Sequence, residues 1–171
     1  MILDTIMLCP CGSKILLAEC CLPYIKKEQL PASPEQLMRS RFCAYARNNA
    51  QYLYDTYAKN SKENQSVADI QQWAQACKWL ALEVHHGLDN SVGGTVEFSA
   101  YYINNDTLCM LREKSRFIKE EKAWRYLDGD IKQNQVITKI KRNEICPCNR
   151  YKTANTVKKN KKYKHCCAKS Y

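Results

Sequence analysis

Eight of the eleven cysteines in this 171-residue chain fall in two clusters, one near each end. In each cluster two cysteines flank a proline, and an adjacent Cys-Cys pair follows further along the chain. Zinc prefers soft sulfur ligands, and structural zinc sites use four of them in a tetrahedron. A Cys-Pro-Cys turn can direct two thiolates at one point, and the Cys-Cys pair can complete the set. We therefore predict two Zn²⁺ sites, with the ligands Cys9, Cys11, Cys20 and Cys21 in the first and Cys146, Cys148, Cys166 and Cys167 in the second.

Disulfide bonds and inert buried thiols are the alternatives to zinc. A disulfide framework needs an oxidising compartment. Residues 1–8 are apolar but lack the basic start of a signal peptide, and no apolar run reaches the length of a membrane helix. We therefore expect a cytoplasmic protein and favour zinc over disulfides. Cys43, Cys77 and Cys109 lie outside the clusters in apolar surroundings, and we expect them to be buried core thiols.

The second cluster differs from the first in its turn and in its length. Asn149 stands where Gly12 follows the second cysteine of the first cluster, and we expect it to adopt the left-handed conformation that glycine would use. Seventeen residues separate Cys148 from Cys166, against eight in the first cluster. A longer loop is tolerated because loop-closure entropy grows slowly with length. His165 precedes Cys166 directly and is an alternative ligand.

The net charge of +10 is concentrated at the C-terminal end. Residues 139–171 contain 11 of the 27 Lys and Arg residues but only one of the 17 Asp and Glu residues. A tetrathiolate zinc site carries about −2 and would balance only about two of these charges. We therefore expect the excess to bind an anionic surface, with a solvated basic loop as the alternative. The candidate residues are Lys158, Lys159, Lys161, Lys162 and Lys164, with Tyr151 and Tyr163 close by in the sequence.

The chain between the clusters predicts helices first and strands after them. Ser33 and Gln36 form a capping box around Pro34, which fits the first turn of a helix. Short turns between alternating strands indicate an antiparallel meander, and helices followed by strands indicate an α+β fold. We expect a connector over 22–32, helices over 33–48, 50–57 and 66–77, a turn region over 87–94, and strands over 79–86, 95–103, 107–118 and 124–127.

Two parts of the sequence resemble known families. Residues 9–13 with the pair at 20–21 resemble the SEC-C motif, a small zinc knuckle. The middle segment resembles the YchJ family of bacterial proteins, through the stretches Leu37–Phe42, Val96–Phe98, Ser115–Phe117 and Trp124–Gly129.

That family joins SEC-C knuckles to a cystatin-like, or nuclear-transport-factor-2-like, α+β cone, in which a curved antiparallel sheet wraps against helices. The resemblance implies an N-terminal knuckle over residues 7–24, a cone over 31–133, and a C-terminal knuckle with a basic insertion over 141–170. The family has no established biochemical role, so the match implies a fold and a metal but no reaction.

Six polar side chains are candidates for a site inside the cone. A cone fold has a space between its sheet and its helices, and these residues occupy a helix and strands that should face that space. We expect them to converge, either around a ligand or as an internal network of ion pairs. The six are Arg39, Arg41, Glu113, Ser115, Arg116 and Asp128.

The sequence favours a binding protein over an enzyme. No Ser-His-Asp set, Gly-rich phosphate loop or carboxylate pair has diagnostic spacing in it. The expected function is that of a zinc-knuckle adaptor that docks on a protein, a ribosome or a nucleic acid through its basic C-terminal end, and not on a membrane. The alternative is a small-molecule-binding or catalytic protein that uses a pocket of the cone.

Overall fold

A computed structural model describes residues 7–151 and 160–169 of the chain. Helices precede strands, and short 3₁₀ helices lie in both cysteine-rich ends. The helices are α2 (Leu22–Ile25), α3 (Pro34–Ala46), α4 (Ala50–Asp55), α5 (Lys59–Lys62) and α6 (Val67–Ala76). The strands are β1 (Lys78–Asp89), β2 (Gly93–Asn104), β3 (Thr107–Glu120) and β4 (Ala123–Lys139). The 3₁₀ helices are η1 (Leu17–Glu19), η2 (Pro147–Asn149), η3 (Tyr163–His165) and η4 (Cys167–Lys169).

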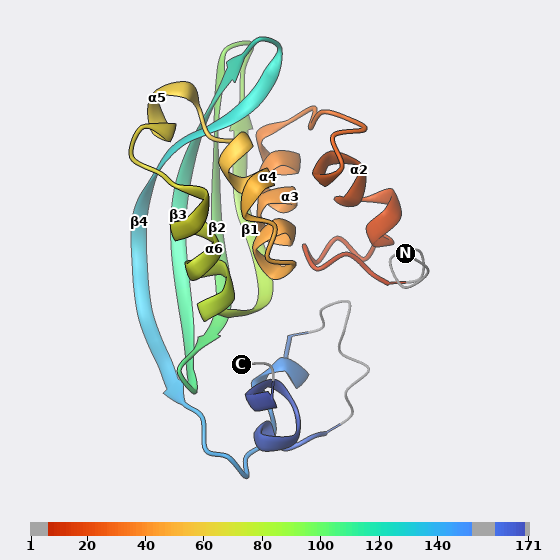
Figure 1. Cartoon of the computed structure of the whole chain (residues 1–171), viewed down its shortest axis with the longest axis vertical. Helices are drawn as coiled ribbons and strands as arrows, with labels where there is room; N and C mark the ends of the chain where they lie inside the picture. Colours follow the sequence, from red (N-terminus) through yellow and green to blue (C-terminus); the bar gives the residue numbers. More distant parts are fainter. Residues whose placement is uncertain (1–6, 152–159, 170–171) are drawn as a thin grey trace.

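The four strands form one antiparallel sheet in the order β1-β2-β3-β4. Figure 1 shows α3, α4 and α6 along one face of this sheet, which we call the inner face. The main core lies between α3 and that face, and the predicted α+β architecture is therefore confirmed. Its buried residues include Leu37, Met38, Phe42, Val96, Phe98, Phe117 and Trp124.

The helix starts follow the capping signals in the sequence. The Ser33 side chain accepts a hydrogen bond from the Gln36 amide at 3.2 Å, and the Ser66 side chain accepts one from the Asp69 amide at 3.0 Å. These caps satisfy amides that have no partner within the helix. The expectation that residues 22–32 form a helix-free connector is wrong, because Pro23 fits the first turn of α2.

Two strands are longer than the sequence pattern indicates. β4 was expected to end near Leu127 but continues to Lys139, and its residues from Gly129 onward are exposed. The strand persists because the long β3 offers it a hydrogen-bonding partner along its whole length. Likewise β1 runs through Gly87 to Asp89, although the sequence predicts a turn from residue 87. Neither extension alternates between apolar and polar residues, so periodicity cannot reveal them.

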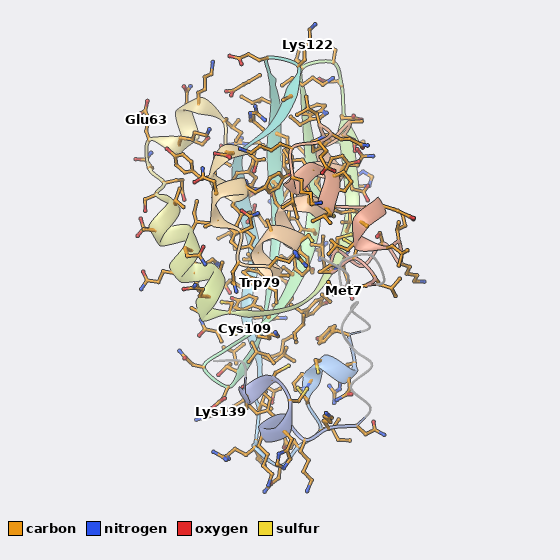
Figure 2. The ribbon with its side chains drawn as sticks, turned by 45° about the vertical axis from the view of Figure 1, so that its right-hand side comes forward. Met7, Glu63, Trp79, Cys109, Lys122 and Lys139 are labelled. Carbon is orange, nitrogen blue, oxygen red and sulfur yellow. The ribbon has the colours of Figure 1, made fainter. Side chains whose placement is uncertain are left out.

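The C-terminal end packs on the outer face of the sheet, opposite the helices. Ile103 and Leu108 point away from the inner face, and they join a buried cluster with the second set of cysteines. The rings of Tyr101 and Tyr151 stack with centroids 4.8 Å apart. Figure 1 places this end beside the termination of β4, and Figure 2 marks Lys139 there, far from Lys122 at the opposite end of the sheet.

Candidate metal centres and the central cavity

The structure brings the first four cysteines into one cluster. The sulfur atoms of Cys9, Cys11, Cys20 and Cys21 all lie within 4.8 Å of one another. The Cys11 and Cys20 sulfurs are 3.6 Å apart, and those of Cys20 and Cys21 are 3.8 Å apart. A tetrahedral ion with zinc–sulfur bonds of about 2.3 Å places its ligands about 3.8 Å from each other. The donor set and its spacing therefore fit a metal ion of the zinc type.

A tight hairpin holds these ligands against α3. The Cys9 amide donates to the Ile15 carbonyl at 2.8 Å, and Gly12 takes a φ of +81° in the turn between them. Arg39 Nη1 donates to the Cys11 carbonyl at 3.1 Å. Cys43, also on α3, is fully buried and packs among the clustered thiols. The knuckle is therefore docked on the central domain by both a hydrogen bond and apolar packing.

The second four cysteines form an equivalent cluster. Their sulfur atoms also lie within 4.8 Å of one another, and those of Cys148 and Cys166 are 3.4 Å apart. Asn149 does not take the expected left-handed conformation, because it belongs to η2, where its side-chain amide donates to the Cys146 carbonyl at 2.9 Å. The His165 side chain is exposed, and four thiols gather without it.

In both clusters the crowded thiols shift one another's pKa values. Hydrogen bonds from Cys11, Cys21 and Cys43 hold the pKa of Cys9 well below its ordinary value. Hydrogen bonds from Cys148 and Cys167 likewise lower the pKa of Cys146 to about 2. Burial instead raises the pKa of Cys20 to about 12. One thiolate in each cluster is thus stabilised by protonated neighbours, and four thiolates together would need a cation among them.

The six polar residues expected to converge form three separate groups, so that expectation is wrong. Arg39 and Arg41 are two positions apart on α3, and at 3.6 residues per turn their side chains leave the helix about 200° apart. Arg39 faces the first knuckle, where it also pairs with Glu35 at 2.8 Å. Glu113 and Arg116 are three positions apart on β3, so they project from opposite faces.

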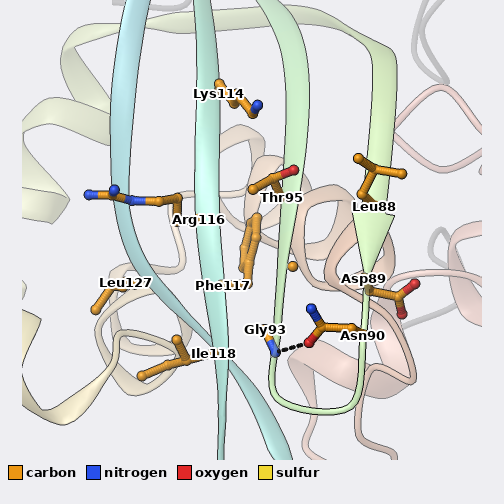
Figure 3. Close-up of a pocket in the computed structure, with 11 residues that line it drawn as sticks. Leu88, Asp89, Asn90, Gly93, Thr95, Lys114, Arg116, Phe117, Ile118 and Leu127 are labelled. Atoms are coloured by element: carbon orange, nitrogen blue, oxygen red, sulfur yellow. Dashed lines mark hydrogen bonds between the residues drawn. The ribbon is translucent and has the colours of Figure 1, made fainter.

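Arg116 and Asp128 form an exposed ion pair on the outer face. Arg116 Nη2 donates to Asp128 Oδ2 at 2.6 Å, and this contact lowers the pKa of Asp128. Arg116 and Lys114 line a groove of about 500 Å³ at that face. Figure 3 shows both residues, together with Asn90, whose side chain accepts a hydrogen bond from the Gly93 amide. An ion pair exposed to this degree contributes little to stability, because solvent screens it.

Arg41, Glu113 and Ser115 do come together, around a cavity of about 100 Å³ between α3 and the inner face. Arg41 is only 3% exposed, and its Nη1 donates to the Leu53 carbonyl at 2.8 Å and to Thr56 Oγ1 at 2.7 Å. Glu113 Oε1 accepts hydrogen bonds from Ser115 at 2.6 Å and from Tyr126 at 2.9 Å. Gly129 makes room for Glu113, because a Cβ there would lie 2.0 Å from its carboxylate.

Comparison with known proteins agrees with this architecture. Residues 33–129 match the family described as "YchJ, middle NTF2-like domain". A UPF0225 protein of Photorhabdus laumondii subsp. laumondii is 35% identical over 165 residues, which cover 94% of this chain and 98% of the relative. The chain belongs to the YchJ family.

Solved structures extend the match to the knuckles. A SEC-C motif containing protein from Rhodopseudomonas palustris superposes with a TM-score of 0.69 at 30% identity, over 72% of this chain and 98% of that one. A SEC-C motif containing protein from Psychrobacter arcticus superposes with a TM-score of 0.66 at 24% identity, over 98% of both chains, and shows likeness of fold. The NTF2-like fold and the YchJ family membership predicted from sequence are therefore confirmed.

The sequence did not reveal the aromatic residues that line the cavity. Tyr57 follows α4 and Tyr126 lies on β4, and a parallel bridge joins their backbones. Trp79 lies on β1 and contacts Phe42 and Tyr45 of α3. No spacing in the sequence connects residues from four elements. The abundance of tyrosine, 11 in 171 residues, is the one available signal.

The basic C-terminal end is described only in part, because Lys158 and Lys159 lie outside the described residues. Lys161 and Lys162 are exposed and Lys164 is half-buried. Tyr163 is fully buried, and its hydroxyl donates to Asp106 at 2.7 Å. Tyr163 therefore anchors the knuckle to the β2–β3 turn and is not available to stack on a nucleic-acid base. Within the described ranges, every helix is too short or too polar to pass through a lipid bilayer.

Proposed function

We propose that both cysteine clusters bind Zn²⁺ and that the chain is a zinc-knuckle adaptor of the cytoplasm. The clustered cysteines gather four at a time and not as disulfide-bonded pairs, which suits a protein of a reducing compartment. The four-sulfur donor sets support zinc, because four clustered thiolates suit a soft tetrahedral ion and disfavour cations that prefer oxygen ligands.

Metal analysis tests the first half of this proposal. Protein purified without added metal should contain about two zinc ions per chain. Reduced, folded protein that holds no zinc would overturn the assignment of the knuckles. Iron in place of zinc would keep the four-thiolate geometry but contradict the identity of the ion.

The C-terminal knuckle supplies the surface through which we propose docking on RNA, including RNA of the ribosome. Its basic side chains are exposed on a scaffold that the metal site, Tyr163 and the outer face of the sheet hold in place. Among the described residues of this end, only Lys141 has an acidic partner, Glu144 at 4.0 Å. The exposed cations of this end that have no ion-pair partner, among the residues that the structure describes, are Lys139, Arg142, Arg150, Lys161 and Lys162.

This arrangement favours contact with phosphates over reading of bases. The two tyrosines of the knuckle are engaged, Tyr163 in burial and Tyr151 in stacking on Tyr101. Binding driven by lysine and arginine alone releases counterions and is nearly independent of sequence. The affinity for RNA should therefore fall steeply as salt is raised.

A charge-matched comparison tests the docking surface. The variant Arg150→Gln/Lys161→Gln/Lys162→Gln should bind total RNA or ribosomes at least tenfold more weakly at 50 mM salt than the wild type does, with its zinc content unchanged. The control Lys114→Gln/Lys119→Gln/Lys122→Gln removes the same charge from exposed positions of β3 and the β3–β4 turn and should bind like the wild type. Equal binding by all three proteins would refute the surface, as would binding to polyglutamate in preference to RNA.

A further inference from the structure

The cavity under α3 is lined by two charged side chains, Arg41 and Glu113, which form no ion pair with each other. The Arg41 guanidinium lies between two rings, with its central carbon 4.5 Å from the centroids of both Tyr57 and Tyr126. Within the described part of the chain, no carboxylate forms an ion pair with it. Nη1 has two acceptors, whereas Nε and Nη2 have none among the described residues. A buried charge of this kind is costly unless a partner reaches it.

A second donor without a partner lines the same cavity. Trp79 Nε1 is buried and has no hydrogen-bond acceptor in the described structure. Buried side-chain donors are normally bonded, and an exception calls for an explanation. Trp124 shows the ordinary state, because its Nε1 donates to the Ala32 carbonyl at 3.0 Å. The residues that line the cavity thus include Arg41, with donors at Nε and Nη2 that have no acceptor among the described residues, and Trp79, with an indole N–H that has none.

The remaining walls limit what can enter. Hydrogen bonds from Ser115 and Tyr126 orient the Glu113 carboxylate but leave its charge in place. Glu113 therefore disfavours a ligand with more than one anionic group, while it can accept a hydrogen bond from a ligand hydroxyl. The other lining side chains are mostly flat or apolar, among them Phe42, Tyr45, Trp73 and Phe98. The volume of about 100 Å³ is about two thirds of that of a cavity that holds a single benzene ring, about 150 Å³, so a ring-sized ligand would be only partly enclosed.

We propose that this cavity binds a small monocarboxylate with a flat apolar body. The carboxylate accepts hydrogen bonds from Arg41 and from Trp79 Nε1, which removes both unsatisfied donors. The flat body lies against the aromatic walls, where ring contacts add to the burial of apolar surface. The site is separate from both metal clusters and from the basic end, so it does not depend on the adaptor function.

The indole N–H resonances provide a direct test with benzoate as the probe. The chain has three tryptophans, and Trp→Phe variants assign their signals in a ¹H–¹⁵N spectrum. Titration with benzoate should shift the Trp79 signal and leave the Trp124 signal in place. Benzyl alcohol has the same ring without the charge and should bind at least tenfold more weakly. An unmoved Trp79 signal at 10 mM benzoate, or equal binding of the two compounds, would overturn the proposal.

Variants separate binding from folding. Arg41→Met should abolish benzoate binding, whereas Arg116→Met removes a guanidinium from the outer face and should leave binding unchanged. Because Arg41 is buried, Arg41→Lys is the second variant, and it keeps a charge without the planar pair of donors. It should remain folded and bind at least fivefold more weakly. Wild-type affinity in folded Arg41→Lys and Trp79→Phe proteins would refute the proposed contacts.

Discussion

A buried pair of hydroxyl groups joins α3 to α4. Ser40 is fully buried, and its hydroxyl donates to the Leu37 carbonyl at 2.9 Å. The Tyr52 hydroxyl lies 2.7 Å from Ser40 Oγ and can donate to it. The net contribution of such a hydrogen bond to stability is modest. Removing one partner costs more than this contribution, because the other partner is then left buried and unsatisfied.

Removing one or both partners should therefore give unequal costs. We predict that Ser40→Ala lowers the free energy of unfolding by about 1–3 kcal/mol and Tyr52→Phe by about 0.5–1.5 kcal/mol. The double variant should cost less than the sum of the two, since no orphaned hydroxyl remains. Urea denaturation of all four proteins measures this coupling. Strict additivity would show that the two hydroxyls do not interact.

The burial of Tyr52 also predicts sensitivity to alkali. Burial raises its pKa to about 12, against about 10 in an unfolded chain. The folded protein then holds this proton more tightly than the unfolded chain. Its contribution is complete below pH 10 and is lost as the pH rises from 10 to 12. Between these values the wild type should lose about 2 kcal/mol more stability than Tyr52→Phe does, as measured by urea denaturation at each pH. Parallel losses in both proteins would contradict a buried Tyr52.

Among single residues, the grouping of the cysteines was predictable from the sequence, whereas the partners of the charged residues were not. Four sulfur ligands at fixed spacings specify a site with little regard to the surrounding fold. Arg39, Arg41, Glu113 and Arg116 gave no such signal, because the side from which each leaves its helix or strand decides its partners. Glu113 and Arg116 could have been separated by strand parity, whereas the position of Arg41 between two tyrosines depends on tertiary packing.

The seating of α3 on the sheet depends on one close approach. A Cβ at Gly94 of β2 would lie 2.5 Å from Pro34 Cγ and 2.8 Å from the Leu88 carbonyl. A Cβ at Gly87 of β1 would come no nearer than 3.8 Å to Glu35, in the same region. A Cβ at Gly94 would therefore require the start of α3 or the β1–β2 hairpin to move, whereas a Cβ at Gly87 would make an ordinary van der Waals contact.

These two glycines form a matched pair for testing that contact. We predict that Gly94→Ala lowers the free energy of unfolding by about 1–3 kcal/mol through overpacking. Gly87→Ala should change it by no more than about 0.5 kcal/mol, since the added methyl group makes only ordinary van der Waals contacts. Thermal and urea denaturation of both variants would measure the difference. Equal effects would show that the helix start yields without cost.

The types and the order of the helices and strands were predictable, but their lengths and the directions in which their side chains point were not. Capping residues indicated where α3 and α6 begin. In β1, however, an irregularity between Trp79 and Ala81 turns Leu80 toward the C-terminal knuckle while Leu82 faces the helices. Such a bulge breaks the period of two on which the reading of a strand depends. The apolar character of Leu80 is therefore explained only by the knuckle that covers it.

The whole molecule joins two knuckles to different surfaces of one domain. The first rests on α3 beside β1, where Gly12 approaches the Leu82 carbonyl. The second covers the outer face near Ile103 and Leu108. Each knuckle has a buried cluster of its own, whereas the core between α3 and the sheet contains none of the eight clustered cysteines. The central domain should therefore fold without either metal.

Loss of one ligand should accordingly disable one knuckle and spare the rest. We predict that Cys20→Ser lowers the zinc content from about two ions per chain to about one. The main thermal transition should stay cooperative, because the core between α3 and the sheet keeps all its contacts. Cys109→Ser is the control, since this half-buried thiol belongs to neither cluster and should leave both ions in place. Metal analysis with calorimetry would follow both effects. If Cys20→Ser abolished the main transition, the first knuckle and the central core would have to be regarded as one cooperative unit, with Cys43 of α3 as the point where they meet.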